Sequence, residues 1–327
     1  MKATAVAPAN IAFIKYWGKK DDLLRLPANG SISMNLDKCL TTTTVEFDKK
    51  YKKDSFKMIG GKVSIKECRR VSDYLSRFRM MAKSKLFAKV VSKNSFPRSS
   101  GAASSASGFA ALSLAASSAL GLNLSEKELS ILARLGSGSA CRSVPSGFVE
   151  WLEGDSNNTS YAHSLYPPGY WDLLDILVIF SGEMKKTTTT EGHKASRETS
   201  LFYSLRVEKA KELLGKLKKA FIKKDFESAG KIIESDCINM HSVMMTTTPP
   251  LFYWSPKTLG LIKKVYEWRD EGIRVYFTID AGVNVHLICK EKTGREVVKK
   301  LEETAGIERI IINKPAVGAQ TINQHLF

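Results

Sequence analysis

Segments with the periodicity of strands alternate with segments that have the periodicity of helices along the whole chain, and this alternation limits the fold more than any other feature. Alternating or β-branched residues predict strands at 3–14, 40–47, 88–92, 147–154, 173–181, 273–279, 284–290 and 308–312. Helical spacing predicts helices at 64–83, from the small-residue loop 98–108 to Leu120, from Ser125 onward, within 193–236, and at 256–270 and 294–304. The pattern predicts an α+β fold with no short repeat and no low-complexity linker.

Local signals mark where two of these helices begin and end. Gly121 follows the alanine-rich helix, as glycine commonly does just past a helix C-terminus. Ser125 and Glu128 have the spacing of a capping box, in which each residue satisfies a free backbone N–H of the first turn. The sequence therefore predicts that one helix ends near residue 120 and that the next begins at Ser125.

The composition of the chain changes after Ser181-Gly182, where a polar Lys/Thr stretch precedes long helices. Boundaries between domains fall in polar segments that few contacts cross. We therefore expect an N-terminal domain at residues 1–182 and a C-terminal domain at residues 183–327.

The chain is strongly basic, with 50 Lys and Arg residues against 33 Asp and Glu residues and a net charge of +17. Such a charge is compatible with a nucleic acid, an acidic surface or polyanionic small substrates. The basic residues are spread along the whole chain, mostly beside acidic residues, and no nucleic-acid-binding signature accompanies them. We therefore expect solvated helix faces and no nucleic-acid partner.

The sequence shows no membrane or export signal. No run approaches about 18 uninterrupted apolar residues, and the N-terminus lacks the charged and apolar regions of a secretory signal. We therefore expect a cytoplasmic protein without a membrane partner.

Five cysteines are scattered along the chain without a CxxC pair or a histidine at metal-binding spacing, which argues against a zinc site. Reduced thiols are the ordinary state in a cytosol. However, the chain has few glutamines and many Lys and Glu residues, a composition that proteins of hyperthermophiles tend to have. Intracellular proteins of hyperthermophiles can keep disulfides. An odd number of cysteines leaves one for an intersubunit disulfide, so both readings stay open.

The segment from Ser99 to Gly108 contains only Ser, Gly and Ala residues and leads into a helix. Small residues let the backbone approach a ligand closely, and a helix N-terminus favours phosphate. The segment lacks the lysine of a P-loop. It predicts either a phosphate-binding loop or a flexible Ser/Ala turn.

A second segment, Gly136 to Ser143, interleaves two glycines with serines before Arg142. Backbone amides and hydroxyls in such a segment can bind an anion, and an arginine can grip a carboxylate or phosphate with two nitrogens. The alternative is a glycine–serine turn with an exposed arginine.

Two further segments carry candidate charged groups. If Asn10 to Lys19 is a strand, Lys15 and Lys19 share one side, and a lysine in this apolar run needs a partner; the alternative is an edge lysine that reaches solvent. Asp280 lies between a strand and a glycine turn, where it can take a proton or accept hydrogen bonds from the turn.

Together and in this order, these segments resemble the diphosphomevalonate decarboxylase family of the GHMP kinase superfamily. The resemblance runs from residue 3 to about residue 325. It is carried by Ala7–Ala12, Lys15–Lys19, Gly101–Gly108, Gly136–Ser143, Met240–Ser242 with Thr248–Pro250, and Asp280–Gly282.

The resemblance implies the GHMP kinase fold, with an N-terminal α/β domain, a C-terminal ferredoxin-like α+β domain and an active site in the cleft between them. It also implies a homodimer that uses ATP and Mg²⁺. The implied reaction phosphorylates the 3-hydroxyl of (R)-5-diphosphomevalonate and then releases phosphate and CO₂ to give isopentenyl diphosphate.

The resemblance also implies roles for single residues. Asp280 matches the catalytic aspartate, as base or orienter of the 3-hydroxyl, and Arg142 matches the arginine that grips the substrate carboxylate. Asn10 and Lys15 match residues at the reacting centre. Ser105 matches the loop serine near the ATP phosphates and is a candidate Mg²⁺ ligand.

Two larger sets follow from the same likeness. The residues implied for the substrate diphosphate are Tyr16, Lys19, Ser137, Gly138, Ser139, Thr190 and Arg197. The residues implied for the nucleotide are Ser92, Asn94, Ser99, Gly101, Ala103, Ser104 and Ser105.

The chain departs from the family pattern at Arg25, at Ala102 after Gly101, and at Val283 where proline is usual. None of these departures removes a catalytic group. Arg25 leaves open a relative that decarboxylates 5-phosphomevalonate to isopentenyl phosphate. A mevalonate-type kinase without decarboxylation is the other alternative, and the presence of both Asp280 and Lys15 argues against it.

Overall fold

The computed structural model describes residues 1–97, 104–180 and 189–327, and the side chains of Thr189 and Thr190 lie outside that description. The first sheet contains β1 (Lys2–Ile14), β4 (Ser31–Asp48), β5 (Ser55–Ile59), β6 (Phe87–Asn94), β7 (Phe148–Trp151), β8 (Ala162–Tyr166) and β13 (Gln320–Ile322). The second sheet contains β9 (Leu173–Phe180), β10 (Val275–Thr278), β11 (Val285–Lys290) and β12 (Ile307–Asn313). A short hairpin pairs β2 (Lys19–Asp21) with β3 (Leu26–Pro27).

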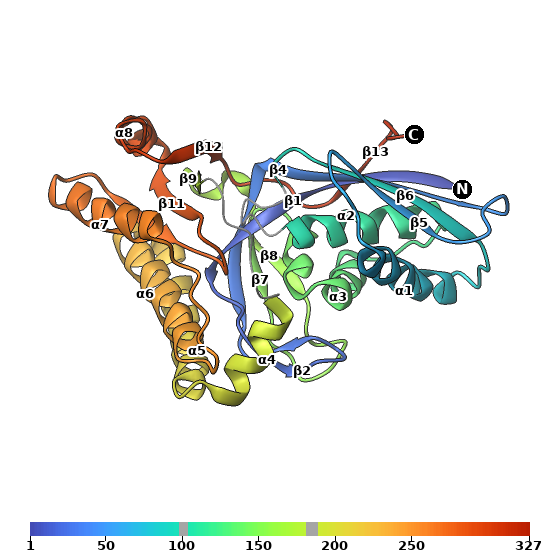
Figure 1. Cartoon of the computed structure of the whole chain (residues 1–327), viewed down its shortest axis with the longest axis horizontal. Coiled ribbons are helices and arrows are strands. Elements are labelled where there is room, and N and C mark those ends of the chain that lie inside the picture. The colour runs from blue at the N-terminus through green and yellow to red at the C-terminus, as the bar shows by residue number, and fades with distance from the viewer. Residues whose placement is uncertain (98–103, 181–188) are drawn as a thin grey trace.

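Helices cover these sheets and confirm the α+β expectation. They are α1 (Ile65–Met81), α2 (Ser104–Ala119), α3 (Glu126–Gly136), α4 (Thr189–Thr199), α5 (Tyr203–Lys223), α6 (Phe226–Met245), α7 (Pro256–Asp270) and α8 (Glu291–Glu302), with short 3₁₀ helices η1 (Gly138–Ser143) and η2 (Pro168–Tyr170). Helices α1 to α3 lie on one side of β1 and β4, whereas α5 to α7 lie on the other (Figure 1).

The strand order shows how the sheets are built. The first sheet runs β13-β1-β4-β6-β5, with β7 and β8 continuing from β4, and the second runs β10-β11-β9-β12. β1 and β4 pair antiparallel along most of their length. The lower ends of these two strands reach the helices of the second half (Figure 1), which places residues from distant parts of the sequence at one location.

The capping signals act as the sequence predicts, but α2 begins earlier than expected. The Ser125 side chain accepts the N–H of Glu128 and the Glu128 side chain accepts the N–H of Ser125, so the predicted capping box is confirmed. α2 begins at Ser104, inside the segment 98–108 that was expected to be a loop. Its small residues allow the helix to pack closely against β1 and β4, and this packing extends the helix toward its N-terminus.

One hydrophobic core joins the two sheets. It includes Ile11 and Phe13 from β1, Leu177 from β9, Phe221 from α5 and Ile233 from α6, all at most 1% exposed. Burying side chains of this size contributes roughly 1.5–3 kcal/mol each. The end of β1 is therefore fixed against the second sheet and against the helix pair α5–α6.

The sheets do not divide the chain at residue 182. β9 lies before that position but pairs with β11 and β12 in the second sheet. β13, near the C-terminus, returns to pair with β1 in the first sheet. We therefore propose a first domain of residues 1–172 with 314–327 and a second domain of residues 173–313, because β9 is buried along its whole length in the second sheet.

All five cysteines are free thiols, and four of them are buried. Only Cys68 has appreciable exposure. Within the described residues, no helix is both long enough and apolar enough to cross a membrane.

Candidate active site

A buried ion pair connects the two halves of the molecule. Lys15 Nζ lies 2.7 Å from Asp280 Oδ1, with side-chain exposures of 1% for Lys15 and 27% for Asp280. Lys15 directly follows β1 of the first sheet, and Asp280 follows β10 of the second. The idea that Lys15 is an edge lysine reaching solvent is therefore wrong.

The segment after β1 is also not the continuous strand that was considered for residues 10–19. β1 ends at Ile14, and Gly18 turns the chain with a φ of +110°. A Cβ at Gly18 would lie 2.1 Å from the Tyr203 hydroxyl, so only glycine fits here. Lys15 and Lys19, on the two sides of this turn, pair with different carboxylates, Asp280 and Asp22.

Asp280 is held in its ionised form. Burial raises the pKa of this carboxyl, but attraction to Lys15 and to more distant cations outweighs burial and leaves the pKa below its ordinary value. A carboxylate with a low pKa is a weak base, although it still accepts and orients a hydroxyl group. The geometry therefore favours orientation over strong proton abstraction in the ground state.

Arg142 and Asn10 form a connected group beside this pair. Arg142 is 3% exposed; its Nε donates to Asn10 Oδ1 at 3.1 Å and its Nη1 donates to Ser31 Oγ at 2.8 Å. Asn10 Nδ2 in turn donates to Ser143 Oγ at 2.8 Å. Arg142 Nη2 makes no hydrogen bond with any residue that the structure describes. This nitrogen is available to an anionic ligand, so the exposed-arginine alternative is wrong.

The segment from Gly136 to Ser143 ends α3 and forms η1 rather than an open turn. A Cβ at Gly138 would lie 2.7 Å from Tyr16 Cε1, which explains the glycine. Ser137 Oγ lies 3.2 Å from Ser105 Oγ, at the start of α2. Ser139 holds Asn10 through its carbonyl oxygen at 3.2 Å. Residues expected to bind the substrate therefore lie next to a residue expected to bind ATP.

Lys19 and Arg197 lie together around one carboxylate. Lys19 Nζ forms a short ion pair with Asp22, and Arg197 Nη2 lies 3.3 Å from Asp22 Oδ2. Arg197 Nη1 also donates to the Lys19 carbonyl oxygen at 2.8 Å. Hydrogen bonding to Lys19 keeps the pKa of Asp22 below its ordinary value, against a smaller opposing effect of burial. The buried Lys19 and the partly exposed Arg197 share one exposed carboxylate and form a cation cluster suited to a polyanion.

His193 was not recognised from the sequence as a site residue. Its ring lies 4.7 Å from the Tyr16 ring and 4.3 Å from the Trp17 ring. Its Nδ1 accepts the N–H of Gly18 at 3.2 Å. Burial lowers the pKa of His193 to about 3, so the ring is neutral. His193 therefore holds the Gly18 turn through its ring nitrogen. Only the tertiary fold reveals this contact, because no charge or spacing in the sequence connects His193 with Gly18.

Part of the expected nucleotide set lies within the described residues. Ser92 is buried and its hydroxyl lies 2.8 Å from Thr43 Oγ1. Asn94 Oδ1 accepts from Thr41 Oγ1 at 2.9 Å, while its buried Nδ2 has no partner among the described residues. An amide donor of this kind fits an acceptor atom of a nucleotide.

The first turn of α2 provides the rest of the observable nucleotide set. Ser104 and Ser105 stand at the N-terminus of this helix, and Ser105 is exposed. Free backbone N–H groups and the helix dipole at such an end favour phosphate. The residues present therefore fit ATP. Three expected nucleotide residues, Ser99, Gly101 and Ala103, and the side chain of Thr190 lie outside the described residues.

No group of His, Cys, Asp and Glu side chains that could hold a metal ion occurs among the described residues. The Ser105 hydroxyl stands near the expected phosphates and is an oxygen ligand of the type that Mg²⁺ accepts. Mg²⁺ usually keeps several waters and is held mainly through substrate phosphates, so one protein hydroxyl is consistent with its use.

Two family models together cover most of the chain. A diphosphomevalonate decarboxylase-like N-terminal domain matches residues 7–162, and a mevalonate 5-diphosphate decarboxylase C-terminal domain matches residues 176–322. The diphosphomevalonate decarboxylase of Homo sapiens is 34% identical over an alignment of 316 positions, gaps included, that covers 90% of this chain and 78% of the relative. That of Candida albicans is 32% identical over an alignment of 358 positions, gaps included, that covers 99% of each chain.

Solved structures show the same similarity. The mevalonate diphosphate decarboxylase of Staphylococcus aureus superposes with a TM-score of 0.94 at 39% identity and covers 98% of both chains. A structure described as MDDEF in complex with MVAPP, AMPPCP and magnesium superposes with a TM-score of 0.94 at 39% identity and covers 99% of both chains.

Proposed function

The chain belongs to the diphosphomevalonate decarboxylase family and is an ATP-dependent decarboxylase of diphosphomevalonate, and we propose that the Lys15–Asp280 ion pair is its reacting centre. The single observation that carries this assignment is the 2.7 Å contact between Lys15 Nζ and Asp280 Oδ1. The contact joins residues that are far apart in the sequence, and Arg142, whose Nη2 has no hydrogen-bond partner among the described residues, lies close enough to attract the Asp280 carboxylate.

The overall reaction consumes ATP and (R)-5-diphosphomevalonate and yields isopentenyl diphosphate, ADP, phosphate and CO₂. Bound ATP would supply the phosphoryl group that is transferred to the substrate 3-hydroxyl, and Mg²⁺ would neutralise part of the negative charge of the ATP phosphates. The bond from carbon 3 to the phosphorylated oxygen then breaks. The electron pair of the bond between the carboxylate and carbon 2 becomes the new double bond, and CO₂ leaves.

Asp280 accepts a hydrogen bond from the 3-hydroxyl and orients its oxygen for attack. Phosphoryl transfer has a loose transition state in which the attacking oxygen loses its proton late. A carboxylate with a lowered pKa is therefore sufficient, because it receives the proton only after the new bond to phosphorus has begun to form. Lys15 offsets negative charge that develops on the transferred group.

Arg142 holds the substrate carboxylate. Its Nε and Nη1 are fixed by Asn10 and Ser31, so its remaining nitrogen points in a defined direction. A guanidinium that is already oriented loses little side-chain entropy when it binds a carboxylate. Asn10 and Ser31 therefore act on the substrate through the orientation of Arg142.

The cation cluster of Lys19 and Arg197 binds the substrate diphosphate together with Tyr16 and the Ser137–Ser139 segment. Asp22 pairs with both cations. A diphosphate carries more negative charge than a monophosphate, so it competes better with Asp22 for two cations. Arg25, whose Nε donates to the Leu135 carbonyl oxygen at 3.0 Å, adds a third cation that the usual family pattern lacks.

A two-substrate assay tests this assignment. Purified protein is supplied with ATP and Mg²⁺ and with either 5-diphosphomevalonate or 5-phosphomevalonate, and CO₂ release gives kcat/KM for each. We expect at least a tenfold preference for the diphosphate, which is about 1.4 kcal/mol. A higher kcat/KM for the monophosphate would overturn the assignment of the cation cluster.

We also propose a homodimer in the cytoplasm. Five free thiols suit a reducing compartment such as the cytoplasm. Homodimers are usual in the diphosphomevalonate decarboxylase family. Light scattering should report about twice the protomer mass of 36.3 kDa. An intersubunit disulfide would have to use Cys68, because the other four cysteines are buried. A band at the dimer mass on denaturing electrophoresis without reductant would support this disulfide, and a band at the monomer mass would reject it.

A further inference from the structure

One face of α6 contacts the backbone next to both members of the ion pair. Asp236 Oδ2 accepts the N–H of Lys15 at 2.7 Å. The N–H of Ile279, the residue before Asp280, donates to Cys237 Sγ at 3.2 Å. Asp236 and Cys237 are neighbours on this helix, and both are 0% exposed.

A third residue of α6 reinforces the second contact. His241 Nε2 lies 3.3 Å from the Ile279 carbonyl oxygen, and Cys237 Sγ lies 3.6 Å from the same oxygen. Cys237 and His241 are four positions apart and therefore share one side of the helix. The peptide groups on both sides of Ile279 are held by α6.

We propose that Asp236, Cys237 and His241 of α6 are positioning residues that set the separation of Lys15 and Asp280. This inference rests on the proposed role of that ion pair. Lys15 and Asp280 follow strands of different sheets, and α6 packs against both β1 and β10. A shift of α6 therefore changes the position of both charged groups relative to each other.

The environment of Asp236 indicates a positioning role more than a stabilising one. Arg206 Nη2 lies 3.0 Å from Asp236 Oδ2, with both residues at most 3% exposed. Arg206 Nε and Nη1 are buried and have no hydrogen-bond partner among the described residues. The desolvation of such a pair can exceed the gain from its attraction. We therefore explain the Arg206–Asp236 pair by the contact that Asp236 makes with the N–H of Lys15, and not by a gain in stability.

Cys237 and His241 are uncharged in this environment. Burial raises the pKa of Cys237 to about 12 and lowers the pKa of His241 to about 3. The neutral thiol accepts from the Ile279 N–H and donates toward the Ile279 carbonyl. The His241 ring faces that carbonyl with Nε2, so Nε2 carries the proton. These neutral contacts fix the chain before Asp280 without adding charge to the site.

The first test uses two double variants that remove the buried charges and differ in one acceptor. Arg206→Met with Asp236→Asn keeps a side-chain oxygen that can accept the N–H of Lys15. Arg206→Met with Asp236→Leu has nearly the same volume and lacks that oxygen. We expect the Leu form to have a kcat about 10- to 100-fold below that of the Asn form, because small misplacements of reacting groups cost this much.

Substrate binding separates positioning from damage elsewhere. The KM values for ATP and for 5-diphosphomevalonate should differ less than threefold between the two double variants. Equal kcat values, measured on folded protein at a temperature below both melting transitions, would overturn the inference. Equal losses in kcat and in substrate binding would also overturn it, since that result indicates general disruption.

Asp54 offers a matched control for Asp236. Asp54 is a buried carboxylate that pairs with Arg79 at 2.9 Å and accepts the backbone N–H of Ala88 at 2.8 Å. It lies in the first domain, and none of its contacts reaches the ion pair. Asp54→Asn should lower the melting temperature and leave kcat within twofold of the wild type. A kcat loss there as large as in the Leu variant would contradict the inference.

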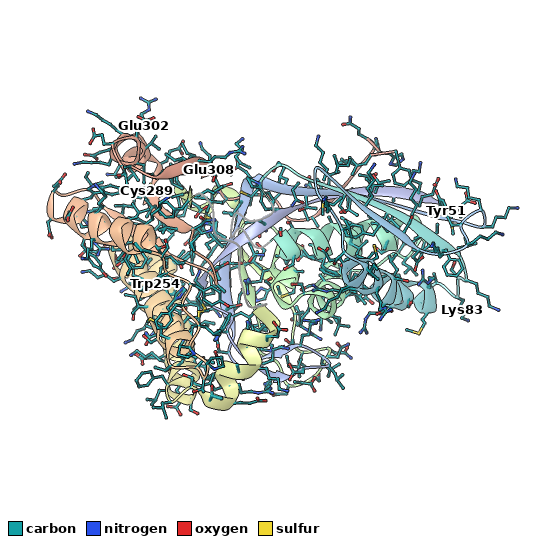
Figure 2. The ribbon with its side chains drawn as sticks, in the orientation of Figure 1. Tyr51, Lys83, Trp254, Cys289, Glu302 and Glu308 are labelled. Carbon is teal, nitrogen blue, oxygen red and sulfur yellow. The ribbon has the colours of Figure 1, made fainter. Side chains whose placement is uncertain are left out.

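Cys237 has its own control in Cys289. Both cysteines are 0% exposed and pack in the same hydrophobic core, and Cys289 lies on β11 in the second sheet (Figure 2). Cys237→Ala should lower kcat about tenfold, and Cys237→Ser should restore part of the loss because a hydroxyl also donates and accepts. Cys289→Ala should lower stability only. Equal kcat effects of the two alanine variants would reject the role of Cys237.

The wild-type assay keeps this inference distinct from the proposed function. If the wild type releases CO₂ from 5-diphosphomevalonate while the α6 variants keep full kcat, the positioning role is wrong and the function stands. If the wild type releases no CO₂, the function itself is wrong.

Discussion

At the scale of single residues, Asp280 combines access with a fixed charge. It is the more exposed member of a pair whose lysine is 1% exposed, so a substrate hydroxyl can reach the carboxylate while the lysine remains shielded from water. Electrostatic groups act most strongly when they are already oriented in a site that excludes water. The pair therefore has the arrangement needed to stabilise charge during phosphoryl transfer.

Asp280→Asn should remove this function without unfolding the protein. The amide retains the shape of the carboxylate but cannot accept the hydroxyl proton or attract Lys15. We expect kcat for CO₂ release to fall roughly 10³-fold or more, with a melting temperature near that of the wild type. A variant with more than a tenth of the wild-type turnover would remove Asp280 from the mechanism.

The buried His241 makes stability depend on pH. Its pKa is about 3 in the folded protein and about 6.5 when unfolded. Because the unfolded chain binds the proton first, stability falls as the pH drops from about 6.5 toward about 3. Between about pH 7 and about pH 4.5, this histidine alone should cost about 2–3 kcal/mol.

His241→Gln checks that value, because glutamine can place an N–H near the Ile279 carbonyl and does not titrate. Urea unfolding at the two pH values should show a smaller loss of stability in the variant than in the wild type. Parallel losses in the two proteins would show that His241 is not a buried neutral ring.

At the scale of elements, the junction of α3 and η1 shapes the surface for the substrate. Tyr16 packs directly on Gly138, and a Cβ at that glycine would lie 2.8 Å from the tyrosine hydroxyl. The ring must therefore move if any side chain is added. The same junction contains Ser137 and Ser139, which are expected to bind the diphosphate.

Gly138→Ala should therefore raise the KM for 5-diphosphomevalonate by about tenfold or more and leave the KM for ATP within a few fold. Steady-state kinetics with each substrate varied in turn measures both constants. An unchanged KM for 5-diphosphomevalonate would show that Tyr16 and Gly138 do not shape its binding surface.

The sequence predicted most elements because their signals are local. The capping box at Ser125 and the alternating residues of the strands depend only on neighbouring positions. The continuous strand considered for residues 10–19 failed because Gly18 turns the chain where Tyr203 approaches it, a contact across 185 positions of sequence that no local pattern contains. α2 begins at Ser104, before the predicted start of the helix, because its small residues pack closely on β1 and β4.

The site could be predicted only in part, for the same reason. Local sequence singled out Lys15, Asp280 and Arg142 as candidates, the family resemblance added Asn10 and gave all four their roles, and the structure brings them into one region. Asp236 was missed because an aspartate in a helix has no distinctive sequence signal. Its function becomes apparent only when α6 packs against β1 and its carboxylate meets the N–H of Lys15.

At the scale of the whole molecule, the two sheets are interlocked. β9 crosses into the second sheet before the expected boundary, and β13 returns to the first sheet. A core of residues from β1, β9, α5 and α6 lies between the sheets. The reacting centre depends on this arrangement, because each member of the ion pair follows a strand of a different sheet.

A fragment of residues 1–182 should therefore fail to fold cooperatively. All eight residues of β9 are buried in the full chain, and in the fragment this strand would lose both of its partners, β11 and β12. Thermal unfolding followed by circular dichroism should show no sharp transition for the fragment. A cooperative transition like that of a stable domain would support a boundary at residue 182 after all.

The most direct test of the central claim is the stoichiometry of products from the wild-type protein with ATP, Mg²⁺ and (R)-5-diphosphomevalonate. If the Lys15–Asp280 centre phosphorylates the 3-hydroxyl and the phosphorylated product then decarboxylates, ADP, phosphate and CO₂ should appear in equal amounts throughout the time course. Formation of ADP without CO₂ would contradict this account and would show that the protein only transfers a phosphoryl group.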